Sequence, residues 1–243
     1  MQNTSPFKNL GIGLGLRIPH YSYIFANKPK IDFFEIISEN FMVEGGPPLE
    51  NLKKILDHYP VVQHGVSLSL ASAEETDWEY IKKLKNLTQI TKTPYFTDHL
   101  CWTRFNSHNF HDLLPIPYTE EYALFIAEKA KIIQDKMGLP FGIENLSTYV
   151  GFESSEMEEW EFYNLVVEKS GCYMMLDINN IFVSARNHNF DAKIYLDSIK
   201  WDRVLQCHIA GPTERADGTF VDTHDSPAVS YTHLRAHETR IHL

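Results

Sequence analysis

The sequence predicts an α/β fold, a (β/α)₈ barrel that lacks its last βα unit. Seven short apolar runs alternate with longer amphipathic stretches, which is typical of parallel strands joined by helices. Most of the runs are apolar almost throughout, as expected of strands buried on both faces. Seven such units in about 210 residues fit this barrel. An open doubly wound sheet is the alternative, but Gly11, Gly13 and Gly15 are followed by no glycine at position 18, so the dinucleotide-binding fingerprint is incomplete.

The elements follow one another along the chain, each with its own signal. Strands are predicted at the short apolar runs, residues 11–17, 31–37, 61–66, 95–99, 141–144, 173–177 and 204–210. Helices are predicted where apolar residues recur with helical spacing, at residues 49–58, 77–91, 120–137, 157–170 and 191–198. Gly138 and Gly171 follow two of these helices, where glycine commonly ends a helix. No linker or repeat interrupts the pattern, which predicts one domain over residues 1–227.

The C-terminal segment differs from the rest of the chain. Residues 228–243 read AVSYTHLRAHETRIHL, hold three of the twelve histidines and have no clear apolar period. We expect this tail to be non-native, translated from sequencing-adaptor read-through, and a genuine polar helix is the alternative. Its histidines are therefore left out of the candidate site.

The composition narrows the class of function. The formal net charge of −10 argues against a general nucleic-acid binder, which would carry a basic stripe. Cys101, Cys172 and Cys207 form no CxxC pair, so free thiols in a reducing cytosol are the simplest interpretation. The sequence shows no signal peptide and no apolar stretch long enough to cross a bilayer. We therefore expect a cytoplasmic protein with neither nucleic acid nor membrane as its partner.

The chemically informative residues follow or end the predicted strands. The second strand is followed by Glu39, and a DTH sequence beyond the seventh contains Asp222 and His224. In a parallel barrel the carboxyl ends of the strands meet at one mouth, where active sites are built. Asp222 and His224 are two residues apart, so in extended backbone their side chains point to the same face. The other acidic, histidine and asparagine side chains at strand ends are His64, His99, Glu144, Asp177, Asn180 and His208.

This set of side chains suits a metal site. Crowded carboxylates would repel one another and raise one another's pKa, and divalent cations remove that penalty. Histidine, aspartate and glutamate without a cysteine pair suit iron, manganese or zinc. Each residue also has a structural interpretation, because His64 or His99 alone could be an ordinary core histidine. Glu144 and Asp177 could cap the following helices. Glu39 could belong to a turn.

Several longer motifs resemble one known family. They are GIGLGLR from residue 11, EIISEN from 35, QHGVSLSL from 63, TDHLCW from 97, GIENLSTY from 142, LDINNIFVSARNHNFD from 176, HIAG from 208 and DTHDSP from 222. Together they resemble the multinuclear non-haem iron-dependent oxidative enzymes (MNIO, domain-of-unknown-function family 692) over residues 8–227. The resemblance implies a barrel of the xylose-isomerase and endonuclease IV type.

The resemblance also implies a function and its site. It implies two or three irons in mixed Fe(II)/Fe(III) states, with O2 as co-substrate for oxidising cysteines in a ribosomally made precursor peptide. A small partner protein would present that peptide. Glu39 becomes a candidate proton acceptor or a group supporting the ligands. The implied iron ligands are His64, His99, Glu144, Asp177, Asn180, His208, Asp222 and His224.

One departure from the family pattern follows DTHDSP. The family continues with a helix and an eighth strand that carries an acidic ligand, where this chain has the unusual tail. We therefore expect this chain to be poorly stable or inactive. Equal iron content and melting temperature in a version extended with a relative's C-terminus would contradict this expectation.

Other functions stay open at the level of sequence. A metal-dependent phosphodiesterase of the endonuclease IV kind would need a surface for DNA, against which the negative charge weighs. Sugar isomerisation would need a catalytic lysine or histidine, and the strand ends carry no lysine. A metal-binding module without catalysis would take up iron but consume no oxygen.

Overall fold

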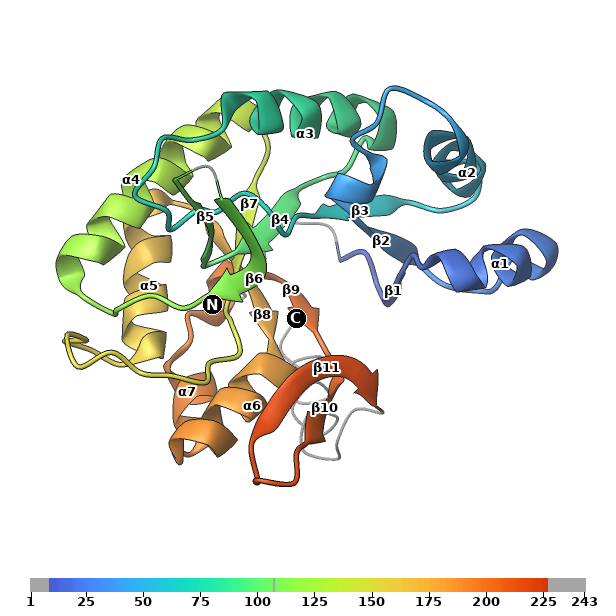
Figure 1. Ribbon diagram of the computed structural model, residues 1–243. Helices are drawn as coiled ribbons and strands as arrows, with labels where there is room; N and C mark the ends of the chain where they lie inside the picture. Colours follow the sequence, from blue (N-terminus) through green and yellow to red (C-terminus); the bar gives the residue numbers. More distant parts are fainter. Residues whose placement is uncertain (1–8, 107, 227–243) are drawn as a thin grey trace.

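A curved sheet of parallel strands forms the centre of the molecule. The computed structural model describes residues 9–106 and 108–226. Every neighbouring pair in the sheet is parallel, and the strand order is β1-β2-β3-β4-β7-β8-β9 (Figure 1). The strands are β1 (Gly13–Gly15), β2 (Phe33–Ile37), β3 (Val61–His64), β4 (Phe96–His99), β7 (Phe141–Glu144), β8 (Tyr173–Asp177) and β9 (Val204–His208).

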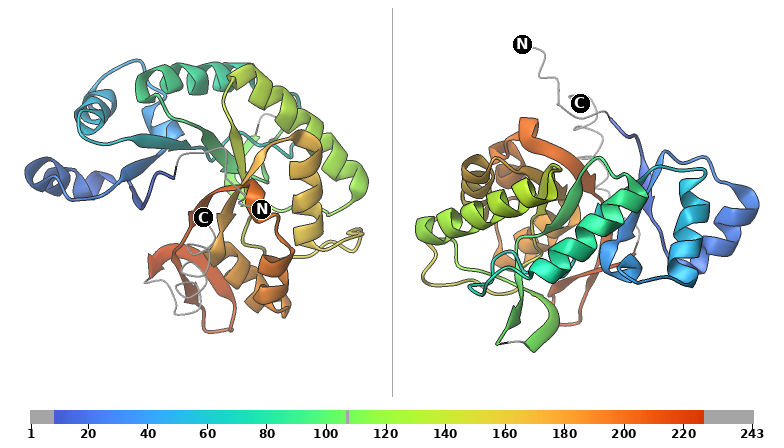
Figure 2. Two further views of the ribbon diagram at one scale, coloured as in Figure 1. Left: turned by 180° about the vertical axis from the view of Figure 1, so that it is seen from behind. Right: turned by 90° about the horizontal axis from the view of Figure 1, so that it is seen from above.

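Helices cover the convex side of this sheet (Figure 2). Each predicted helix is present with ends shifted by at most two residues, and Gly138 and Gly171 end α4 and α5 with φ of 71°. The helices are α1 (Tyr21–Asn27), α2 (Pro47–Leu56), α3 (Trp78–Thr91), α4 (Glu120–Met137), α5 (Glu159–Ser170), α6 (Ile178–His188) and α7 (Ala192–Ser198). Short 3₁₀ helices are η1 (Ile18–His20), η2 (Ser38–Phe41) and η3 (Trp201–Arg203).

The main core lies between the helices and the convex face of the sheet. Phe96 and Phe141, opposite each other on β4 and β7, stack there with ring centroids 4.6 Å apart. A smaller cluster holds Phe33 of β2, Val62 of β3 and Tyr95, with Leu205 of β9 packed against it. Because β2 and β9 are not neighbours in the sheet, their side chains can meet only across its concave side. The sheet therefore curves as a barrel does, and the predicted fold class is confirmed, with seven strands in this sheet among the described residues.

Several elements were not predicted. Two hairpins extend from the sheet. One consists of β5 (Trp102–Phe105) and β6 (His108–Leu114), and the other of β10 (Gly211–Glu214) and β11 (Phe220–Ser226). Their strands are mostly polar and lack a period-2 apolar pattern, so the sequence did not identify them. Helices α1 and α6 were also missed, and the predicted strand at residues 11–17 narrows to three residues. The predicted non-native tail, residues 228–243, lies outside the described residues. No helix in the described part of the chain is both long and apolar enough to traverse a bilayer.

Candidate metal centre

Five strands each end in a potential metal ligand. His64, His99, Glu144, Asp177 and His208 are the last residues of β3, β4, β7, β8 and β9. In the sheet register His99 lies opposite Glu144, and Asp177 lies opposite His208. Parallel strands bring all their carboxyl ends to the same edge, so the five side chains meet at one pole of the barrel.

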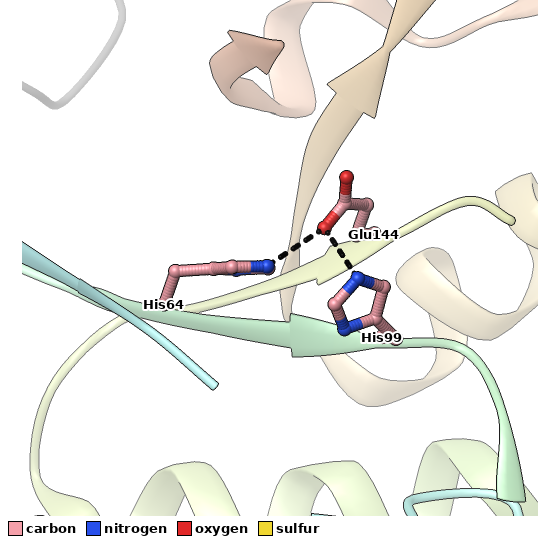
Figure 3. Close-up of side chains that lie close together, drawn as sticks. All are labelled: His64, His99 and Glu144. Carbon is pink, nitrogen blue, oxygen red and sulfur yellow. Dashed lines mark ion pairs between the residues drawn. The ribbon is translucent and has the colours of Figure 1, made fainter. Parts of the chain in front are cut away.

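The first group consists of two histidines facing one carboxylate. Nε2 of His64 lies 3.3 Å and Nε2 of His99 lies 3.1 Å from Oε2 of Glu144 (Figure 3). All three residues are less than 10% exposed. The facing donor atoms of this group lie within 4.8 Å of one another, close enough to share one cation.

The second group uses the other side of the same carboxylate. Nδ1 of His208 lies 3.3 Å from Oε1 of Glu144 and 3.9 Å from Oδ2 of Asp177. These three residues also offer donor atoms within 4.8 Å of one another. Glu144 therefore belongs to both groups and could bridge two cations.

The β10–β11 hairpin brings a third pair of donors to the same place. Nε2 of His224 lies 2.8 Å from Oδ1 of Asp222 and 3.7 Å from Oδ2 of Asp177. The two side chains lie together, as their spacing predicted, although His224 has a φ of 53° and so departs from extended backbone. The amide of Asn179 donates to Oδ1 of Asp222 at 2.6 Å and so ties the hairpin to α6.

Hydrogen bonds select the ring nitrogens that face the centre. Nδ1 of His64 contacts Oγ1 of Thr97 at 2.8 Å, and Nδ1 of His99 contacts the carbonyl oxygen of Gly65 at 3.1 Å. A carbonyl can only accept, so Nδ1 of His99 carries a proton, and Nε2 is the ligand atom when the ring is neutral.

Burial and mutual charge set the protonation of the centre. Burial would raise the pKa of Glu144, but His99, His208 and His64 hold that pKa well below its usual range. Burial, followed by the charge of Glu144, raises the pKa of Asp177 to about 7. Burial lowers the pKa of His64 to about 4. Burial opposes the charge of His99, but Glu144 and Asp98 raise its pKa to about 9. Protons on some of the imidazoles thus offset the buried carboxylates.

The donor set fits a metal ion on independent grounds. Oδ2 of Asp177 and Oδ1 of Asn180 are buried without a hydrogen-bond partner, and Oε2 of Glu144 meets only the ring nitrogens of His64 and His99. A buried acceptor without a donor costs about 1–3 kcal/mol, and a coordinated cation would remove that cost. Asp177 also fills the structural role considered from the sequence, because its Oδ1 accepts from the backbone N–H of Asn180 and caps α6. Oδ1 of Asp177 therefore caps the helix, while Oδ2 is available for a metal ion.

Glu39 lies apart from these groups. Its Oε1 accepts from the backbone N–H of Val66 at 2.8 Å and from the hydroxyl of Tyr80 at 2.7 Å. The same hydroxyl lies 3.3 Å from Oδ2 of Asp98, the residue before His99. Glu39 is not among the residues that line the cavity at the centre.

One acidic residue in the centre was missed by sequence reasoning. Glu35 occupies the middle of β2, and both of its carboxylate oxygens lie 2.9 Å from Nε2 of His208. It is the first residue of the EIISEN motif, but it does not follow a strand, so the strand-end pattern did not select it. The strand reads FFEII without a period-2 alternation, so no local pattern marked Glu35 as part of a site.

A cavity of about 480 Å³ opens above the donors. Its wall includes Tyr149 from the β7–α5 loop and residues 109 and 111–113 from the β5–β6 hairpin. The hydroxyl of Tyr149 accepts from the backbone N–H of Asp222 at 3.2 Å, which joins two walls of the cavity. Arg17 is the one lysine or arginine among the described residues of this lining.

The fold and site define the chain as an α/β barrel protein with a candidate multinuclear metal centre at the carboxyl ends of its strands. Solved structures support the fold: the 3-keto-D-glucoside 4-epimerase YcjR from E. coli has a TM-score of 0.61 at 13% identity, covering 96% of this chain and 88% of that one. The probable 3-DHS dehydratase AsbF from Bacillus anthracis also has a TM-score of 0.61, at 11% identity, covering 95% and 89%. At such identities the likeness concerns the fold alone.

The chain belongs to the family described as RiPP precursor modification enzyme MbnB/TglH/ChrH, whose sequence pattern matches residues 11–235. A UPF0276 protein of Caulobacter vibrioides is 45% identical over 218 residues, which cover 89% of this chain and 78% of that protein. UPF0276 protein AM1_3026 of Acaryochloris marina is 40% identical over 217 residues, covering 89% and 78%. The family suggested by the sequence motifs is thus confirmed.

Proposed function

We propose that this protein uses a multinuclear iron centre and dioxygen to oxidise cysteine residues of a ribosomally synthesised precursor peptide. The observation that carries the proposal is the shared position of Glu144, whose two oxygens face two separate groups of nitrogen and oxygen donors. Family membership supports a precursor peptide as the substrate.

The chain offers ligands for two or three ions. His64, His99 and Glu144 would hold the first ion, and Glu144, Asp177 and His208 the second. Asp222, His224 and the unpaired amide oxygen of Asn180 would add ligands for the second ion or hold a third. Mixed imidazole and carboxylate donors without thiolate suit iron. Iron there would supply redox chemistry with dioxygen and a positive charge that lowers the pKa of the substrate thiol.

The residues around the centre would position the peptide and exclude water. The cavity of about 480 Å³ would receive the cysteine side chain, and the β5–β6 hairpin and the β7–α5 loop form part of its wall. In the reaction the cysteine residue is the electron donor and dioxygen is the electron acceptor. We propose that Glu39 acts through Tyr80 and Asp98, either supporting His99 or accepting a proton, without touching the substrate.

The proposal also includes a small partner protein and a cytoplasmic location. A small partner protein would present the precursor peptide at the cavity mouth. All three cysteines are free thiols, which supports a role in the reducing cytoplasm.

The test combines metal analysis with an oxygen requirement. The protein is purified with iron supplied, its metals are measured by elemental analysis, and it is incubated with a cysteine-containing peptide encoded beside its gene. We expect iron as the dominant metal and a peptide mass change that requires air and a cysteine. Peptide modification without oxygen would contradict the mechanism. Zinc content together with cleavage of abasic DNA would instead support a hydrolase.

A further inference from the structure

We propose that Glu35 is a positioning residue that holds the ring of His208 with Nδ1 toward Glu144 and Asp177. This inference rests on the proposed metal centre and assigns a role to a residue outside its ligand set. Both oxygens of Glu35 lie 2.9 Å from Nε2 of His208, and the two side chains are 15% and 21% exposed. The contact is therefore largely shielded from water.

Glu35 is itself held in place by its neighbours. The side-chain amide nitrogen of Gln206 donates to Oε2 of Glu35, and the hydroxyl of Tyr95 donates to Oε1 of Gln206 at 2.8 Å. Gln206 and His208 are two residues apart on β9, so both face the concave side of the sheet. A chain of hydrogen bonds thus runs from Tyr95 through Gln206 and Glu35 to His208.

The three strand-end histidines face the centre through different ring nitrogens. Nδ1 of His64 contacts Thr97, Nδ1 of His99 contacts the carbonyl of Gly65 with Oδ1 of Asp98 3.8 Å away, and both rings present Nε2 to Glu144. His208 presents Nδ1 instead, and its Nε2 meets the carboxylate of Glu35. A carboxylate can only accept, so Nε2 carries a proton and Nδ1 is left as the ligand atom when His208 is neutral.

A carboxylate behind a metal-binding histidine has known consequences. It fixes the tautomer and the ring orientation and makes the imidazole a stronger ligand. Losing such a partner commonly weakens metal binding by about 10- to 100-fold. Glu35 should therefore matter for the ion bound by His208 more than for the ion bound by His64 and His99.

The test measures binding of Co(II) to metal-free full-length protein, by visible absorption and by proton NMR. Variants are Glu35→Ala, Glu35→Gln, and Thr97→Val as a matched change behind His64. We expect Glu35→Ala to weaken one of two Co(II) binding steps by about 10- to 100-fold and to abolish the paramagnetically shifted, exchangeable proton signal of His208. Glu35→Gln keeps an acceptor oxygen and should retain most of the Co(II) affinity and most of the His208 proton signal. Thr97→Val should instead weaken the binding step of the ion held by His64 and His99.

Three results would overturn the proposal. Glu35→Ala could bind both Co(II) ions as tightly as the wild type and keep the signal, or it could weaken both binding steps equally, as general unfolding would. It could also fail to take up the second ion even at saturating Co(II), which would make Glu35 a direct ligand. Wild-type protein that binds fewer than two Co(II) ions would refute the two-ion centre and this role together. Failure of peptide oxidation alone would refute only the proposed function.

Discussion

Oε1 of Glu144 lies 3.3 Å from Nδ1 of His208, while its other oxygen faces the two histidines of β3 and β4. One buried carboxylate at the end of β7 thus contacts donors from strands on both sides of β7. The sheet order places β3 and β4 on one side of β7 and β8 and β9 on the other, so β7 is the middle one of the five strands that end in a potential ligand.

Replacing Glu144 should remove more metal than replacing any single histidine. Glu144→Gln keeps the side-chain shape but removes the negative charge from both groups of donors. We expect the variant to lose most of the metal at both sites, whereas His64→Ala should empty only the first. Elemental analysis after equilibrium dialysis measures this difference. Equal metal loss in the two variants would contradict a bridging role for Glu144.

Metal affinity should rise with pH in the range around neutrality. Burial and Glu144 raise the pKa of Asp177 to about 7, so the carboxyl is mostly protonated at pH 6. A ligand must lose its proton to bind the metal, so affinity should fall by about tenfold per pH unit below pH 7 for each proton displaced. Calorimetry in buffers with different ionisation enthalpies counts those protons. Asp177→Asn should release fewer of them, and an unchanged proton count would argue against this assignment.

The buried Glu159, the first residue of α5, should make the protein less stable as the pH rises. Burial raises its pKa to about 7 from 4.5, and Oε1 accepts from the hydroxyl of Tyr195 at 2.9 Å. The folded state holds this proton more tightly than the unfolded state. The resulting stabilisation is therefore complete below pH 4.5 and is lost as the pH rises to 7.

Glu159→Gln tests this effect because it keeps the acceptor oxygen but cannot ionise. The variant should be less sensitive to pH and, at pH 8, more stable than the wild type by roughly 3 kcal/mol at most. Urea unfolding at pH 5 and pH 8 provides the free energies. The exposed Glu121→Gln on α4 is the control and should behave as the wild type. Parallel pH profiles for wild type and Glu159→Gln would disprove the prediction.

Gly65→Ala should disturb both stability and the first donor group. A Cβ at this position would lie 2.3 Å from Oδ2 of Asp98 and 2.9 Å from the hydroxyl of Tyr80. Such overpacking costs about 1–3 kcal/mol, and it would displace the Gly65 carbonyl that contacts Nδ1 of His99. Melting temperature and metal content should both fall. Gly151→Ala is the control, because nothing lies within 4 Å of its Cβ position; the prediction fails if the two variants melt alike.

Much of the candidate site could be predicted because it follows from strand direction alone. His64, His99, Glu144, Asp177 and His208 each end a strand, and parallel strands carry their ends to one edge whatever the connecting loops do. Asp222 and His224 were recognised as a pair from their spacing. The hairpin that brings them to Asp177 was not, because its strands carry no apolar alternation.

Other placements depend on packing between segments that are far apart in the sequence. Glu39 follows β2 directly, yet η2 places it against Tyr80 of α3, away from the donors. Glu35 lies in the middle of a strand, where an acidic residue gives no local signal of a site. Only the curvature that brings β2 opposite β9 shows that it meets His208.

The sequence by itself therefore determined the alternating elements, the barrel class and the row of donors at the strand ends, because these depend on local hydrophobic patterns and on one rule of parallel sheets. The tertiary structure alone decided which carboxylate is shared, which nitrogen of each histidine faces the centre, and which acidic residue stands behind His208. Those features depend on distances across the concave side of the sheet, and such distances exist only once the sheet has curved and its side chains have packed.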